Sequence, residues 1–137
     1  MTAGNRLTDL WRRVRPTPTL GARGERAAAS HLKRHGYRVI ARNRRSRLGE
    51  LDLLALSPDR RRLVVVEVKA GQHGSPLPPE VHVNPAKQRK ITALAAEFVR
   101  RHRFAARPIR FDVIAVAFDD DRVADLRHHE AAFESHV

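Results

Sequence analysis

The sequence contains no cysteine, a single tryptophan, a single tyrosine and five phenylalanines. Without cysteine, the chain forms no disulfide bond and offers no thiolate to a zinc ion. So few aromatic rings argue against a platform on which single-stranded nucleic acid stacks. The sequence also lacks a G-x-x-x-x-G-K-[ST] phosphate loop and a Ser/His/Asp acyl-transfer motif.

Long hydrophobic runs are missing as well. The longest apolar stretches, such as LVVV and VIAVAF, have the length of a strand and not of a membrane span. The N-terminal stretch MTAGNRLTDLWRRVR has no apolar core of the kind found in secretory signals. We therefore expect no membrane partner and a cytoplasmic location. A length of 137 residues, 42% of them hydrophobic, predicts one globular domain with a modest core.

Positive charge is abundant. The chain has 27 Lys and Arg residues against 15 Asp and Glu residues, a net charge of +12, and only four of the cations are lysine. A small basic domain favours a polyanionic partner, and nucleic acid, most commonly DNA, is the leading candidate. An arginine bias in the coding sequence is an alternative source of part of this charge.

Residues 1–20 form a basic segment with the run PTPT, and we interpret them as a flexible arm preceding one domain at 21–137. An alanine-rich helix is predicted up to Gly36, because glycine commonly follows the last turn of a helix. A second helix is predicted at 85–102, with Asn84 as its N-cap and one apolar stripe along its length. Glycines and prolines in 71–84 predict a long mobile loop.

Four strands are predicted from runs rich in aliphatic residues, at 37–43, 50–56, 63–70 and 110–118. A basic turn, RRSRLG, separates the first two, and Asp119 to Asp121 form a tight turn after the fourth. The segment VADLRHHEAAFE is ambiguous and is interpreted as a short last strand with a frayed tail. The order helix, three strands, helix, strand predicts an α/β fold with a mixed central sheet flanked by helices.

Charged residues interrupt two of the apolar strands. Side chains alternate along a strand, so Glu50 and Asp52 face one side of theirs, and Glu67 and Lys69 face one side of the next. A hairpin joining the two strands would bring these groups together. Carboxylates within about 4 Å of a common point bind Mg²⁺ or Mn²⁺, and a lysine beside them can orient a water molecule. The pattern favours metal-dependent phosphodiester hydrolysis; a solvated rim with an ion pair is the alternative.

Three other groups have weaker chemical signals. His31 and His35 have the spacing of a zinc-binding pair, but no third ligand is evident, and solvent-facing histidines are the preferred interpretation. The aspartates at 119–121 lack the glycine and glutamate spacing of a calcium loop. Asp112 lies within a predicted strand, and we favour a structural partner for an arginine over a catalytic role.

Six blocks of the sequence also resemble a known family, in order and with the usual spacing: GARGERAA, GYRVIARNRR, LGELDLLAL, LVVVEVKA, NPAKQRKI and RFDVIAV. Together they are similar to the YraN-like family of predicted endonucleases, over residues 21–118. That family is similar to archaeal Holliday-junction resolvases and belongs to the restriction-endonuclease-like, PD-(D/E)XK, superfamily. The resemblance implies an αβββαβ core, DNA as substrate with branched or junction DNA as a candidate, and a homodimer as a candidate assembly.

The resemblance also implies roles for particular residues. Asp52 and Glu67 match metal ligands, Glu25 an additional acidic residue, and Lys69 the lysine that positions water. Glu50 is a further candidate ligand, and Gln88 matches a polar position beside the site. The candidates for binding phosphates are Arg42, Arg44, Arg45, Arg47, Lys87, Arg89 and Lys90.

The sequence departs from the family pattern in one place. After the lysine, the family usually has a small or hydroxyl residue and then an arginine, whereas here Ala70 and Gly71 follow. A non-catalytic nucleic-acid-binding or DNA-repair accessory protein therefore remains the alternative to an endonuclease.

Overall fold

A computed structural model describes residues 18–74, 84–104 and 107–133, so residues 1–17 of the predicted arm (1–20) and most of the predicted loop (71–84) lie outside the described residues. In chain order the elements are α2 (Leu20–Arg34), β1 (Arg38–Ser46), β2 (Gly49–Leu56), β3 (Leu63–Gln72), α3 (Pro85–Arg101), β4 (Ile109–Asp119) and β5 (Arg122–Phe133). None of the described helices is long and apolar enough to cross a membrane.

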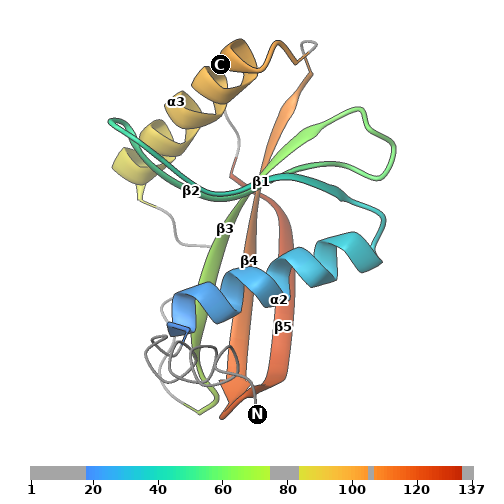
Figure 1. Cartoon of the computed structure of the whole chain (residues 1–137), viewed down its shortest axis with the longest axis vertical. Helices are drawn as coiled ribbons and strands as arrows, with labels where there is room; N and C mark the ends of the chain where they lie inside the picture. The colour runs from blue at the N-terminus through green and yellow to red at the C-terminus, as the bar shows by residue number, and fades with distance from the viewer. Residues whose placement is uncertain (1–17, 75–83, 105–106, 134–137) are drawn as a thin grey trace, which may run out of the picture.

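The five strands form one sheet in the order β1-β2-β3-β4-β5. Strands β3 and β4 are parallel, with α3 in the connection between them, and the other neighbouring pairs are antiparallel. Figure 1 shows α3 at the top of the view and α2 crossing the strands lower down, so the two helices lie against different parts of the sheet. The sequence prediction of a mixed sheet flanked by two helices is confirmed.

Both helices begin at the caps that their sequences suggest. The side chain of Asn84 accepts a hydrogen bond from the backbone amide of Lys87 at 2.8 Å, and Pro85 lies in the first turn. At α2 the cap is Thr19, the last residue of PTPT, which accepts from the amide of Ala22 at 3.1 Å. This helix therefore starts one residue before the predicted boundary. It ends as predicted, before Gly36, whose φ is +86°.

Two layers of core separate the helices from the sheet. One cluster packs α3 against the sheet and includes Leu94, Phe98, Val65 and Phe111. The other packs α2 against the sheet and includes Leu32, Val64, Val66 and Ile114. Alternate residues of β3 therefore belong to different clusters, because its side chains alternate between the two faces of the sheet.

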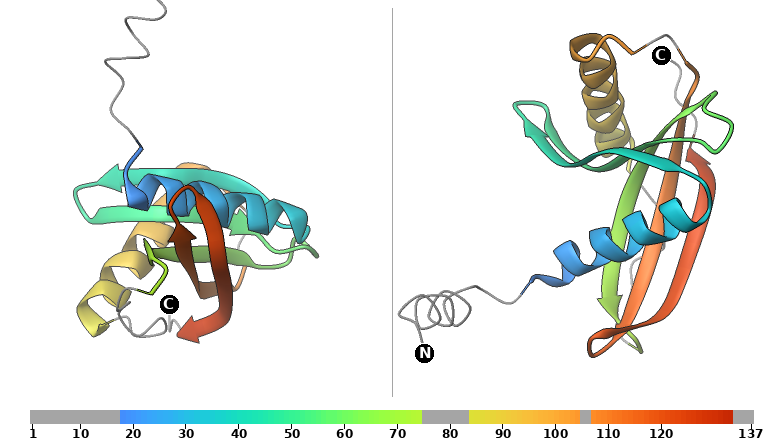
Figure 2. Two further views of the ribbon diagram at one scale, coloured as in Figure 1. Left: turned by 90° about the horizontal axis from the view of Figure 1, so that it is seen from below. Right: turned by 45° about the vertical axis from the view of Figure 1, so that its right-hand side comes forward.

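Strands β2 and β3 form a fork. Their ladder has four paired positions, from Leu53–Val66 to Leu56–Leu63. Beyond it β3 continues along β4 to Gln72, while the first half of β2 stays paired with β1. We call residues 42–52, the part of the β1–β2 hairpin beyond this ladder, the hairpin arm; it projects from the sheet beside α3 (Figures 1 and 2).

Two predicted segments differ from the structure. The basic turn is shorter than expected, because β1 extends to Ser46 and only Arg47 and Leu48 turn before Gly49. The ambiguous last segment is a full strand of 12 residues, β5, paired with β4. Half of its residues are polar or charged, so it lacks a clear apolar periodicity; it is an edge strand with much of one side exposed.

Candidate metal and nucleic-acid site

Acidic side chains from two elements meet at the fork. One carboxylate oxygen each of Glu25, Glu50 and Asp52 lies within 4.8 Å of the other two. Glu25 comes from α2, whereas the other two come from β2 in the hairpin arm. No second group of three or more potential His, Asp or Glu ligands comes together in the part of the chain that the structure describes.

A close approach of α2 to β3 accounts for the position of Glu25. The neighbouring Gly24 is buried against β3, and a Cβ atom at this position would lie only 2.6 Å from the Cβ of Ala70. Only glycine allows the helix to come this near. Glu25 is consequently held beside the open end of the fork.

Asp52 takes part in the sheet at the point where the strands separate. Its Oδ2 accepts a hydrogen bond from the backbone amide of Val68 at 2.9 Å. Burial, with the nearby carboxylates of Glu67 and Glu25, raises the pKa of Asp52 to about 7 although the amide opposes the shift. Burial and the charge of Glu50 raise the pKa of Glu25 as well. Ionised, these groups repel one another, so a bound cation would relieve the repulsion.

Glu67 lies beside Asp52 and is 9% exposed. Its Oε1 forms an ion pair with the ammonium group of Lys87, from the first turn of α3. The sequence suggested Lys87 only as a phosphate-binding cation. Its contact with Glu67, a predicted metal ligand, could not be predicted because the two residues are 20 positions apart and no local pattern connects them. Lys69 lies two residues after Glu67 on the same side of β3 and is half-buried.

Glu50, Asp52, Glu67 and Lys87 border an open cleft, whereas Glu25 and Lys69 are not among its lining residues. Its volume is about 410 Å³, which exceeds the space of a metal ion with several waters at about 30 Å³ for each water. The lining residues are Gly49, Glu50, Asp52, Glu67, Asn84, Ala86, Lys87, Lys90 and Leu94. Gln88 does not line the cleft; it lies half-buried on α3.

Of the predicted phosphate-binding residues, Lys87 and Lys90 line this cleft, whereas Arg44 and Arg45 line a separate pocket between the hairpin arm and α3. All seven predicted residues are exposed. Four belong to the hairpin arm, Arg42, Arg44, Arg45 and Arg47, and three belong to the start of α3, Lys87, Arg89 and Lys90. Arg45 forms an exposed ion pair with Glu50 at 3.6 Å. The structure thus places the acidic centre between two basic elements.

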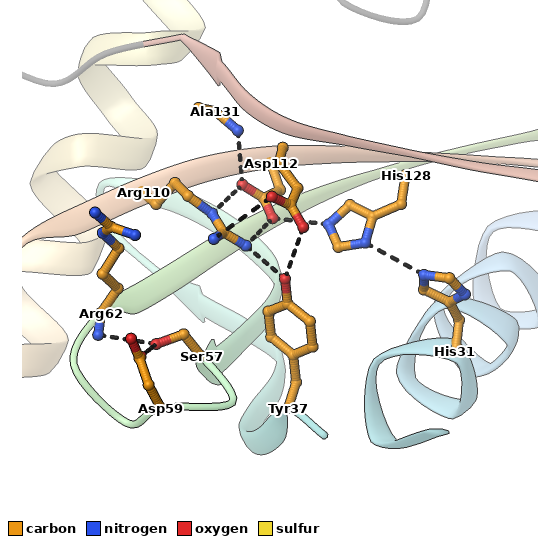
Figure 3. Close-up of polar contacts among 10 residues, drawn as sticks. His31, Tyr37, Ser57, Asp59, Arg62, Arg110, Asp112, His128 and Ala131 are labelled. Carbon is orange, nitrogen blue, oxygen red and sulfur yellow. Dashed lines mark hydrogen bonds and ion pairs between the residues drawn. The ribbon is translucent and has the colours of Figure 1, made fainter. Parts of the chain in front are cut away.

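Asp112 belongs to a separate, buried network (Figure 3). Arg110 donates to both of its carboxylate oxygens, at 2.9 and 2.8 Å, and the backbone amide of Ala131 donates at 3.0 Å. The ring of His128 lies 2.7 Å from the same carboxylate, and Arg110 also donates to the hydroxyl of Tyr37 at 2.7 Å. The interpretation of Asp112 as a structural partner of an arginine is confirmed.

The histidine pair of α2 differs from the prediction of solvent-facing side chains. His35 is exposed, but His31 is partly buried, and its Nε2 lies 3.2 Å from Nδ1 of His128. Burial and the neighbouring His35 and His128 lower the pKa of His31. The partner residue is 97 positions away in sequence, so spacing within the helix could not have revealed it.

Comparison with known proteins gives a consistent result. The profile of the family described as "Uncharacterised protein family UPF0102" matches residues 24–116. A "UPF0102 protein" of Pelobacter propionicus is 42% identical over 114 residues, which cover 83% of this chain and 81% of that protein. One from Geotalea uraniireducens is 36% identical over 116 residues, covering 85% and 90%. One from Porphyromonas gingivalis is 40% identical over 114 residues, covering 82% of each.

Proposed function

This chain belongs to the UPF0102 family, the YraN-like family that its motifs resemble, and from the chemistry of its cleft we propose that it is a metal-dependent endonuclease that hydrolyses DNA. The observation that carries the proposal is the acidic group at the fork. Glu25, Glu50 and Asp52 come within 4.8 Å of one another, and Glu67 lies beside Asp52.

The donor atoms fit a hard divalent cation. All four side chains offer carboxylate oxygens, and the chain has no cysteine, a combination that suits Mg²⁺ or Mn²⁺. Asp52, Glu67 and Glu25 would hold the ion, with Glu50 as a further ligand. Such an ion supplies Lewis acidity, which polarises a phosphoryl oxygen and acidifies a bound water.

The other charged groups of the proposed site have roles that follow from their charges. Lys69, on the same side of β3 as Glu67, is placed to orient the attacking water and to stabilise charge on the phosphate. The exposed arginines of the hairpin arm and the cations of α3 bind phosphates on either side of the cleft. A net charge of +12 favours DNA as the polyanion.

The test is cleavage of branched, flapped and linear DNA by the purified protein in Mg²⁺, in Mn²⁺ and in EDTA. We expect cleavage only with a metal, and its loss in Glu67→Ala and in Lys69→Ala, with DNA affinity largely retained. Glu97→Ala is the matched control, because Glu97 lies on α3 but does not line the cleft. Undiminished cleavage in both the Glu67→Ala and the Lys69→Ala variants would refute the mechanism.

A second candidate function is nucleic-acid binding without turnover. It is favoured by one observation, the presence of Gly71 where the family pattern has an arginine that could contact phosphate. The same assay separates the two: a non-catalytic protein binds these DNAs with a steep salt dependence but leaves them intact in either metal.

A further inference from the structure

The tip of the hairpin arm presents an apolar side chain to solvent. Leu48 is 43% exposed, and Val123, at 48%, is the other exposed large hydrophobic residue among those that the structure describes. Both lie at the ends of β-hairpins, Leu48 in the turn between β1 and β2 and Val123 just after the turn into β5. Val123 is therefore a suitable comparison for Leu48, because it is similarly exposed but lies at the end of a different hairpin.

The tip around Leu48 is held in place. The backbone amide of Leu48 donates to the hydroxyl of Ser46 at 3.1 Å, and Gly49 has a φ of +134°, which side-chain-bearing residues rarely adopt. A Cβ atom on Gly49 would lie 3.6 Å from Leu94 of α3, so the turn rests against that helix. Gly49 and Glu50 line the acidic cleft. Leu48 is consequently fixed next to the place where DNA would be cut.

The charges around the two exposed residues are opposite. The charged residues of the hairpin arm, to which Leu48 belongs, are four exposed arginines and two acidic residues of the cleft: Arg42, Arg44, Arg45, Arg47, Glu50 and Asp52. Val123 follows three aspartates and one arginine, Asp119, Asp120, Asp121 and Arg122, and precedes Asp125, so the charge around it is acidic on balance. DNA phosphates would be attracted to the first tip and repelled from the second.

We propose that Leu48 is a wedge that inserts at a base step of bound DNA, and that the preferred substrates are duplexes whose stacking is already interrupted, as at a nick or a bulge. The proposal rests on DNA being the partner under the proposed function. Apolar side chains flanked by arginine enter base steps and kink the duplex, at a cost of a few kcal/mol for each unstacked step. Where stacking is already broken, much of this cost is absent, which creates the preference.

The experiment uses the full chain in EDTA, so that binding is observed without cleavage. The probes are one duplex with a nick beside a 2-aminopurine and the same duplex without the nick. Anisotropy measures affinity, and the fluorescence of 2-aminopurine, which rises when the base unstacks, reports insertion. The wild type should raise the fluorescence and bind the nicked duplex at least about fivefold more tightly, a difference that follows from the reduced cost of unstacking.

The variants are Leu48→Ala, Leu48→Phe and Val123→Ala. Leu48→Ala should lose the fluorescence rise and the preference for the nick, and its affinity for intact duplex should stay within about twofold because the arginines supply most of that binding. Leu48→Phe, which keeps a large apolar side chain, should retain both signals, and Val123→Ala should match the wild type. A Leu48→Ala protein indistinguishable from the wild type would overturn the inference, as would an equal loss in Val123→Ala.

A parallel cleavage assay in Mg²⁺ separates this inference from the proposed function. Cleavage without any fluorescence response would refute the wedge and leave the nuclease standing. A fluorescence rise that depends on Leu48, with no cleavage, would support the wedge and refute the nuclease. A wild-type protein that binds neither duplex would overturn the wedge.

Discussion

Lys87 and Glu67 form the most consequential contact between single residues in the cleft. Glu67 is nearly buried, and the ammonium group of Lys87 neutralises it from the first turn of α3. A divalent cation that binds Glu67 must compete with this ammonium group, which occupies the neighbourhood of the same oxygen. If the proposed metal binds here, Lys87 should lower its affinity by competing for Glu67, and its ammonium group should become available to a phosphate once the metal displaces it.

We predict that Lys87→Met increases the affinity for Mn²⁺ by about three- to fivefold, in keeping with a partly exposed ion pair worth no more than about 1 kcal/mol. Isothermal titration calorimetry measures the change. Lys90→Met is the control, because Lys90 lines the same cleft and its loss removes an equal charge. An equal gain in both variants would mean that only the general potential matters and that the contact with Glu67 does not.

At the scale of elements, the distance between α2 and β3 decides whether Glu25 reaches the acidic centre. Gly24 and Ala70 are in contact at the point where these elements are closest. The residue pair is a structural requirement of the site, although neither residue has a functional group.

Gly24→Ala should lower both the stability and the affinity for Mn²⁺. The added methyl group overlaps Ala70, at a cost of about 1–3 kcal/mol that exceeds the helix-propensity gain of about 1 kcal/mol. Ala70→Gly in the same protein should restore most of the metal affinity. Gly21→Ala, in the same helix with only a 3.9 Å contact to Thr19, is the control and should not weaken metal binding. Urea unfolding and calorimetry measure the effects; full affinity in Gly24→Ala would contradict the explanation.

The hydrogen-bond network around Asp112 connects β4 with β5 and with the chain just before β1. It connects β4 to β5 through His128 and Ala131, and to the residue before β1 through Tyr37 (Figure 3). Burial alone would raise the pKa of Asp112, but hydrogen bonds from His128, Arg110 and the Ala131 amide outweigh it and lower the pKa below its ordinary value. The folded state therefore holds the ionised form more strongly than the unfolded state does.

The stability contributed by Asp112 should therefore decrease as the pH falls. A carboxyl group with a lowered folded pKa contributes stability above its unfolded pKa of about 3.9 and loses it as the pH falls through the folded pKa. Asp112→Asn should cost about 3 kcal/mol of unfolding free energy at pH 7, because Arg110 loses its charge partner, and the difference should shrink below about pH 4. Asp125→Asn, which breaks an exposed pair with Arg127, should cost under about 1 kcal/mol. Urea unfolding at pH 7 and pH 3 distinguishes these outcomes; an equal cost at both pH values would contradict the assignment.

At the scale of the whole molecule, the sequence predicts the fold class and part of the site. The apolar stripe of α3 and the alternation of Glu67 and Lys69 on β3 are local patterns, so they are legible in one stretch of sequence. The fork between β2 and β3 cannot be predicted from one stretch of sequence, because it depends on β2 staying paired with β1 while β3 stays paired with β4. The contacts of Lys87 with Glu67 and of His31 with His128 join segments that are distant in sequence, and no local pattern encodes them.

Binding of DNA should depend on where the charge lies and not only on its total. We predict that replacing Arg42 and Arg44 together by Gln reduces the slope of log K against log salt by about 2, since each phosphate contact contributes about 0.9. Replacing Arg61 and Arg62, exposed in the turn between β2 and β3, removes the same charge far from the cleft and should leave the slope nearly unchanged. Anisotropy titrations at several salt concentrations provide the slopes; equal reductions in both would indicate diffuse attraction.

The hairpin arm also affects the behaviour of the protein in concentrated solution. Strand β1 is an edge of the sheet, so one side of its backbone has hydrogen-bonding groups that a strand from a second molecule could pair with. The arginines along it oppose such pairing, because two copies brought edge to edge would place like charges side by side. The arginines of the hairpin arm, which are proposed to bind DNA, should therefore also reduce aggregation through this edge strand. Variants that neutralise the arm will be more prone to self-association, and their DNA affinities need to be measured alongside light scattering.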